Sequence, residues 1–204
     1  MTLDVLLVGG LLIGPSYVFL YIFGGALRPD YSHISNSVSE LLSLRSPNRK
    51  TLVGIQVTYA LLHILFGVGV LDVAFRVSDS RLFGCIGAWT IVALGAATIG
   101  TAIFPQDAEG APPTAAGRIH KTLVLGVLVP ASIASTLLIG LWSKTTGLPG
   151  WFTMYSVATA GAIVVMGGAG GAAAKTRFAG LIERIAALVS HQWLFVLALG
   201  LLLC

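Results

Sequence analysis

Charged side chains are scarce in this chain of 204 residues: they make up 10% of it, against 56% hydrophobic residues. A soluble globular domain carries about 25% charge, because its surface faces water. The shortage therefore excludes an ordinary soluble domain and indicates a surface that mostly faces lipid. The net charge of +4 does not point to nucleic acid, because the basic residues lie between apolar runs. In that position they set topology and meet lipid headgroups.

Cysteine and the common catalytic motifs are also nearly missing. Cys85 and Cys204 lie far apart in apolar surroundings, which excludes a disulfide framework. The chain has no Cys-x-x-Cys, no His-x-x-x-His, no phosphate-binding Gly-rich loop and no Gly-x-Ser-x-Gly. We therefore predict no cofactor and no bound metal. A zinc site built from His33, Asp107, His120 and one Glu stays open as an alternative, although its spacing is unspecific.

What the chain does contain is six apolar runs, each about 20 residues long, which is the length needed to cross a bilayer. The runs are 3–27, 52–75, 82–104, 122–142, 151–173 and 181–203. They predict an all-α polytopic membrane protein, in which residues 1–204 form a single integral domain of six packed helices. The first run lacks a basic start and a cleavage motif, so we interpret it as a membrane helix and not as a signal peptide.

Proline and glycine predict local features of these helices. Pro15 and Pro130 fall inside the first and fourth runs, where each should kink the helix or loosen its hydrogen bonds. Gly167 and Gly171 are four residues apart in the fifth run. This spacing permits close helix approach, and we expect it to serve packing inside the bundle.

Lysine and arginine gather at one set of linkers, nine residues against three. The nine are Arg28, Arg45, Arg49, Lys50, Arg118, Lys121, Lys175, Arg177 and Arg184; the three are Arg76, Arg81 and Lys144. Because basic residues stay on the cytoplasmic side, we predict that the first, third and fifth linkers are cytoplasmic. Both termini would then lie outside.

The longest linker carries a helical pattern. At 100° per residue, five apolar residues of the segment fall in one arc about 100° wide, and polar residues cover the other side. The five are Tyr31, Ile34, Val38, Leu41 and Leu42. With Asp30 and Ser32 as capping residues, the pattern predicts a short amphipathic helix at the membrane interface over residues 31–45.

Polar residues from three separate basic linkers should meet at one membrane face. They are Ser39, Glu40, Asp107, His120, Glu183 and Arg184. We call these six the polar mouth and predict that they form one connected cluster. Carboxylates, an imidazole and a cation in one place suit the binding of a lipid headgroup or a small amphiphile at the cytoplasmic side.

Two other interpretations of the polar mouth remain open. The first is an intramembrane hydrolase or transferase acting on a lipid. His120 or Glu40 would then be the general base, with Asp107 or Glu183 orienting it or binding a metal. The second is that interfacial charges only snorkel, cap helices and set topology.

Two histidines lie near mid-membrane instead. Gln56, Tyr59 and His63 form one polar stripe in the second run, and His191 lies in the sixth. Polar groups at such depth must face the interior and find partners. We therefore expect a buried network between His63 and His191 or Tyr59.

These motifs together resemble a prokaryotic membrane family known as domain of unknown function 998. The resemblance rests on the segment 31–41 (YSHISNSVSEL), on Phe104-Pro-Gln-Asp107, on His120 and on the segment 180–185 (GLIERI). It implies a six-helix bundle in a bacterial or archaeal cytoplasmic membrane, and it implies that the six residues of the polar mouth cluster. More distantly, the chain is similar to the Frag1/DRAM/Sfk1 group, some members of which act in lipid handling. His191 matches no position of the family pattern.

Overall fold

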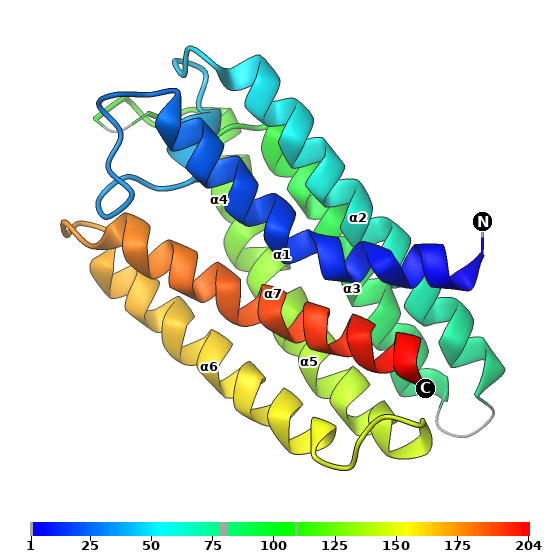
Figure 1. Ribbon diagram of the computed structural model, residues 1–204. Helices are drawn as coiled ribbons and strands as arrows, with labels where there is room; N and C mark the ends of the chain where they lie inside the picture. Colours follow the sequence, from blue (N-terminus) through cyan, green and yellow to red (C-terminus); the bar gives the residue numbers. More distant parts are fainter. Residues whose placement is uncertain (1, 78–80, 109) are drawn as a thin grey trace.

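The computed structural model describes residues 2–77, 81–108 and 110–204, and in these residues it is a bundle of helices without strands (Figure 1). Six helices of the described chain are long and apolar enough to cross a membrane. They are α1 (Leu3–Ala26), α2 (Arg49–Arg76), α3 (Arg81–Ile103), the continuous span of α4 to η3 (Ala115–Thr145), α6 (Phe152–Ala173) and α7 (Ala179–Leu203). The all-helical membrane fold predicted from the six apolar runs is confirmed.

The fourth span begins earlier than its apolar run, at Ala115 and not near residue 122. Thr114 caps it, because the Thr114 hydroxyl accepts a hydrogen bond from the Gly117 amide at 3.1 Å. The first turns of α4 (Ala115–Leu123) are too polar to count as membrane span in a search for hydrophobic runs. His120 therefore lies inside a helix and does not precede one.

Pro130 disturbs the fourth span as predicted. The span widens into a π-helical turn, η2 (Val124–Leu128), directly before α5 (Val129–Trp142). A proline lacks an amide hydrogen and its ring crowds the carbonyl four residues earlier. The wider turn relieves that crowding without ending the helix.

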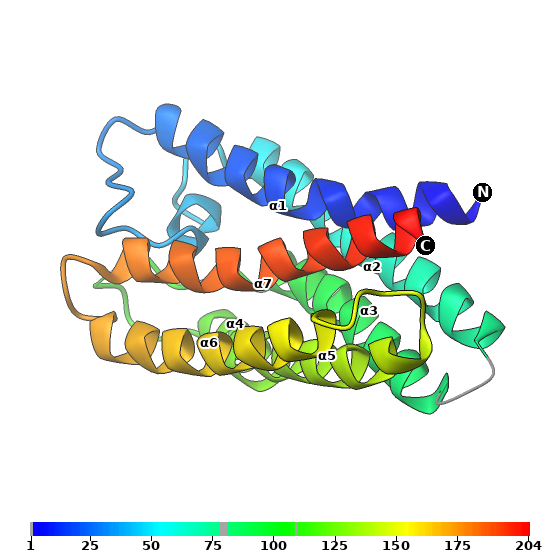
Figure 2. The ribbon, with the colours of Figure 1, turned by 60° about the horizontal axis from the view of Figure 1, so that its bottom comes forward.

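The six spans form a closed ring. Each packs on two neighbours, in the order α1, α2, α3, α4 with α5, α6 and α7, and α7 returns to α1. Figure 2 shows α1 and α7 close together near the two chain ends and further apart toward the long loop. The bend of α1 in Figure 1 lies along the stretch that contains Pro15. This bend carries the second half of α1 away from α7.

Two apolar clusters fill the bundle. The larger one includes Phe66, Trp142 and Trp193, all fully buried, and lies between the helices. The smaller one packs Leu41 and Leu42 of the long loop against α1 and α2. The loop is therefore part of the folded core and is not a free linker.

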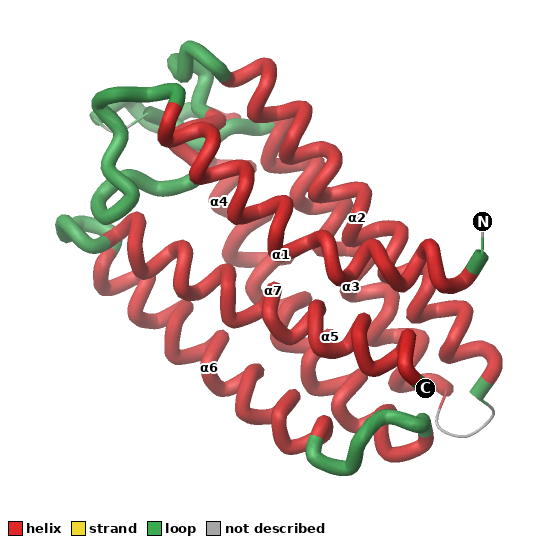
Figure 3. Tube along the Cα trace, in the orientation of Figure 1, coloured by secondary structure: helices red, strands yellow, loops and turns green. Residues whose placement is uncertain are grey.

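The amphipathic helix predicted over residues 31–45 is wrong in extent. Only a four-residue 3₁₀ helix, η1 (Ser39–Leu42), forms there, and the rest is loop and turn (Figure 3). Val38 and Leu41 are buried as the apolar arc predicted, but Ile34 is exposed. A helix fails because α7 takes the loop's carbonyls: the Leu181 amide donates to the Ile34 oxygen at 2.9 Å.

The packing predicted for Gly167 and Gly171 is also wrong. A Cβ atom added at either glycine would meet no atom within 4 Å. Both glycines therefore face away from the other helices of the chain. The close approaches in this bundle occur at other glycines, such as Gly10 against Phe66 and Gly180 against the long loop.

One end of the bundle gathers the long loop 27–48, the loop residues 104–108 and 110–114, and the loop 174–178 (Figure 1). The nine basic residues counted above lie in these loops or in the first two turns of the helices that follow them, α2, α4 and α7. We call it the basic end.

Candidate functional site

Arg184 of α7 is the centre of the basic end, and only 5% of it is exposed. Its Nη1 donates to the carbonyl oxygens of His33 at 2.8 Å, Asn36 at 3.0 Å and Gly180 at 2.7 Å. Its Nη2 donates to the Tyr31 hydroxyl. Its Nε has no hydrogen-bond partner among the described residues. The guanidinium therefore holds the loop's backbone onto α7.

Two carboxylates support the same loop. Glu183 Oε2 accepts a hydrogen bond from the Val38 amide at 3.2 Å, just before η1 begins at Ser39. Glu40 Oε2 accepts one from Asn36 Nδ2 at 2.7 Å. We call Tyr31, Asn36, Glu40, Glu183 and Arg184 the Arg184 clamp, because together they fix the loop over the bundle.

Two titratable side chains of the loop beside Arg184, Tyr31 and His33, are both uncharged at physiological pH. Burial raises the pKa of Tyr31 to about 12, so its hydroxyl stays protonated. That hydroxyl can then donate to the Ser37 oxygen at 2.9 Å while it accepts from Arg184. Burial and the nearby Arg184 charge lower the pKa of His33, so its ring is neutral at physiological pH.

A second polar centre caps the end of α3. His120 Nδ1 lies 3.0 Å from the Phe104 oxygen, and Arg49 Nη2 donates to the Ala102 oxygen at 2.9 Å. Arg49 Nε also donates to the backbone carbonyl oxygen of Leu42 at 3.1 Å. The last carbonyls of a helix have no partner within the helix, so these contacts satisfy them. His120 therefore serves as a cap in this structure.

Asp107 belongs to the same centre. It accepts hydrogen bonds from the Thr114 amide at 3.0 Å and the Thr114 hydroxyl at 2.6 Å, and these bonds lower the pKa of Asp107. Thr114 is in turn the cap of α4. A long hydrogen bond of 3.5 Å from Gln106 to Ser37 links this centre with the loop.

The polar mouth thus has two centres. Glu40, Glu183 and Arg184 meet around the long loop beside Ser39, whereas Asp107 and His120 meet where α3 ends and α4 begins. In the described residues, no three His, Cys, Asp or Glu side chains are grouped to hold a metal ion. The contacts just given hold backbone in place, and this structural use is what the arrangement most directly explains.

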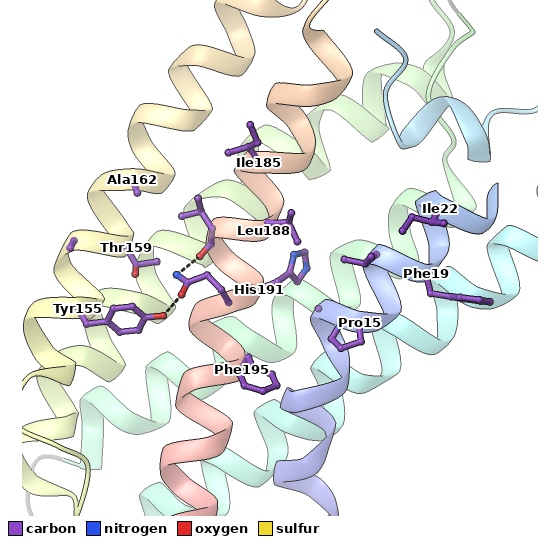
Figure 4. A pocket seen from close by; sticks show the side chains of 15 residues that line it. Pro15, Phe19, Ile22, Tyr155, Thr159, Ala162, Ile185, Leu188, His191 and Phe195 are labelled. Carbon is purple, nitrogen blue, oxygen red and sulfur yellow. Dashed lines mark hydrogen bonds between the residues drawn. The ribbon is translucent and has the colours of Figure 1, made fainter. Parts of the chain in front are cut away.

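A groove on the outside of the bundle was not predicted from the sequence. It is a cavity of about 1080 Å³ between α1, α6 and α7 (Figure 4). Its walls include exposed Phe19, Ile22 and Phe195, so it opens toward the surroundings of the bundle. The groove lies where α1, after the bend at Pro15, departs from α7. Pro15 was thus the only sequence signal for it.

The few polar groups of the groove are mostly paired. The Tyr155 hydroxyl donates to Gln192 Oε1, and Gln192 Nε2 donates to the Val189 oxygen at 3.0 Å. Thr159 lies on the same wall and is buried. The walls are otherwise apolar, which suits a hydrocarbon chain.

His191 lies at the edge of the groove and joins the network expected in mid-membrane. Its Nε2 is 2.5 Å from the Tyr59 hydroxyl, and its ring stacks on Tyr17 with centroids 4.8 Å apart. The ring centroids of His63 and His191 are 6.0 Å apart, and His63 Nδ1 lies 3.1 Å from the backbone carbonyl oxygen of Tyr59. The predicted meeting of His63, Tyr59 and His191 is confirmed. The network is not complete, because His191 Nδ1 has no hydrogen-bond partner in the part of the chain that is described.

Six apolar spans in a closed ring, with an apolar groove on the outside, define an integral multi-pass membrane protein. The chain matches the family model described as Protein of unknown function (DUF998) over residues 11–200, and it belongs to that family. No curated protein and no solved structure matches it. The likeness to the Frag1/DRAM/Sfk1 group is not shown by these comparisons.

Proposed function

We propose that this protein binds a lipid or small amphiphile, with its apolar chain in the groove between α1, α6 and α7. The groove is the observation that carries the proposal. An apolar cavity of about 1080 Å³ on a membrane-embedded surface is filled by lipid or by a hydrophobic ligand.

The length of the groove fits one chain of one leaflet. Along α7 it runs from Ile185 to Phe195, which is about 15 Å at 1.5 Å per residue. The hydrocarbon core is roughly 30 Å thick, so one leaflet contributes about half of it. A chain in the groove would therefore reach from near the basic end to the middle of the bilayer.

The end of the groove nearest the basic end lies beside basic residues, which favour association with an anionic membrane surface. Ile22 and Ile185 line the groove there, next in sequence to Tyr21 and to the buried Arg184. Lys175 and Arg177 are exposed in the loop that joins α6 to α7 at this end. Cations near an anionic membrane surface contribute about 1 kcal/mol each.

Filling the groove tests the proposal. Ala158 is exposed on α6 and lines the groove, whereas its neighbour Val157 is exposed but does not line it. We expect the wild type and Val157→Phe to retain lipid through extensive delipidation, and Ala158→Phe to lose it, as measured by native mass spectrometry. Equal retention in Ala158→Phe, or no retained lipid in the wild type, would contradict the proposal.

We further propose that the basic end faces the cytoplasm, since nine basic residues lie there against three at the other end. Cys204, which is exposed at the opposite end, allows a direct test in a Cys85→Ser background. An impermeant thiol reagent should label Cys204 in intact cells. Labelling only after lysis would show the opposite orientation.

A further inference from the structure

We infer that the groove ligand carries a carbonyl group that accepts a hydrogen bond from His191, and that a lipid-soluble quinone is the class of molecule that fits best. The inference rests on the proposed function, because it names the ligand class of the same groove. Three features of the structure carry it: the unpaired ring nitrogen, its tautomer and its depth.

The first feature is the unpaired nitrogen. His191 is 5% exposed and lines the groove, yet its Nδ1 lacks a hydrogen-bond partner within the described chain. The carbonyl of Ala187, one turn earlier on α7, is close to the ring but does not meet hydrogen-bond geometry. A buried polar atom without a partner destabilises the protein. A ligand that supplies the partner removes this penalty, which increases its binding affinity.

The second feature is the tautomer that Tyr59 favours. The Tyr59 hydroxyl needs an acceptor for its hydrogen, and His191 Nε2 lies 2.5 Å away. When the hydroxyl donates to Nε2, the neutral ring carries its hydrogen on Nδ1. Nδ1 is then a donor, so the matching ligand group is an acceptor such as a carbonyl oxygen.

The third feature is depth. His191 lies twelve residues from either end of α7, Ala179–Leu203, which is about 18 Å from each end. The ester carbonyls of a bilayer phospholipid lie at the interface, far from this level. A quinone ring on an isoprenoid tail dissolves in the hydrocarbon core and brings its carbonyls to mid-membrane. The depth therefore favours a quinone over an ester.

Gly14 of α1 is the neighbour of His191 across the groove. It lines the groove, and a Cβ atom added there would lie 3.6 Å from His191 Cβ. Gly14 and His191 therefore line the groove side by side. Nδ1 itself is covered in this structure. Binding therefore includes a shift of the side chains that cover it, as is common at binding surfaces.

The test measures binding of two probes to the purified full chain by native mass spectrometry. Decylubiquinone carries ring carbonyls, and decylbenzene has the same chain without them. We expect His191→Phe to weaken decylubiquinone binding about ten-fold, the loss of one buried hydrogen bond, and to leave decylbenzene binding unchanged. His191→Gln, which keeps a donor, should retain most of the affinity.

A second variant keeps the test decisive if His191→Phe folds poorly. Tyr59→Phe removes the hydroxyl that fixes the tautomer, so it should weaken decylubiquinone binding and spare decylbenzene. Equal affinity of decylubiquinone for the wild type and for both variants would overturn the inference while decylbenzene binding still supports the groove. If neither probe binds the wild type, the proposed function itself fails. Competition by a diacyl phospholipid that depends on His191 would support the carbonyl site and assign it to an ester.

Discussion

At the basic end, Arg184 gives its Nη hydrogens to three backbone carbonyls and to Tyr31, whereas in mid-membrane His191 uses one ring nitrogen and leaves the other unpaired. Both side chains lie on α7 and both are 5% exposed. The first holds a loop in place, and the second lies beside a groove open to the lipid.

The charged residues of the basic end mostly hold backbone in place. The basic end holds most of the chain's charged residues, but Glu183, His120 and Asp107 are paired with backbone there. Among the described residues, four buried side chains have a polar atom without a hydrogen-bond partner, and of these four only His191 lines the groove; they are Gln56, Trp142, Arg184 and His191. Buried polar atoms are normally satisfied, so the exceptions call for a reason.

The strongest way to break the comparison is to remove the clamp. Arg184→Ala leaves the His33 carbonyl without its donor and the Asn36 carbonyl with only the longer bond from Tyr31 at 3.3 Å, and we expect it to cost about 3 kcal/mol of unfolding free energy. The long loop should also become sensitive to protease in detergent. The control is Arg177→Ala, because Arg177 is exposed and should change stability little. A fully stable, protease-resistant Arg184→Ala would show that the clamp is unimportant.

Steric pressure on the same contact should have a smaller effect. A Cβ atom at Gly180 would lie 2.2 Å from the Asn36 oxygen, which is backbone and cannot give way cheaply. We expect Gly180→Ala to cost about 2 kcal/mol, measured as thermal unfolding in detergent. At Gly161 a Cβ would meet nothing within 4 Å. Gly161→Ala should therefore be neutral or slightly stabilising, since alanine favours the helix.

Removing the cap on α3 should lower stability without changing lipid binding. His120→Ala removes the contact with the Phe104 oxygen, and we expect a loss of about 1 kcal/mol in stability. Lipid retention in the groove should not change. The control is Lys121→Ala, because Lys121 is exposed. If His120→Ala abolished lipid retention at unchanged stability, His120 would belong to the binding site and not only to the cap.

The smallest expected effect is on the pH dependence of stability. The hydrogen bonds from Thr114 lower the pKa of Asp107 in the folded state, so the folded state holds this proton less tightly than the unfolded state does. Its contribution to stability is therefore present above the ordinary pKa of an aspartate and is lost as the pH falls through the lower, folded value. Thermal unfolding between pH 5 and pH 3 should decline less steeply for Asp107→Asn than for the wild type. Identical slopes would contradict this assignment.

The membrane fold could be predicted from the sequence, whereas the groove could not. The apolar runs gave six spans to within a few residues, because a helix across hydrocarbon must be long and apolar. The fourth span began early because Thr114 is a local cap that hydropathy does not register. The periodicity of residues 31–45 correctly predicted the burial of Val38 and Leu41. The predicted helix was wrong, because periodicity could not show that α7 donates a hydrogen bond to a carbonyl of this loop.

The sequence by itself determined the class of the protein, the number of spans, the bend at Pro15 and the gathering of basic residues at one end. These follow from composition and from short-range chemistry, which act along the chain. Only the tertiary structure decided that Arg184 holds a loop about 150 residues earlier in the chain, that Gly167 and Gly171 face outward, and that α1 and α7 part to form a groove beside His191. Such features depend on which helices become neighbours, and neighbours in a bundle are chosen by the packing of the whole chain.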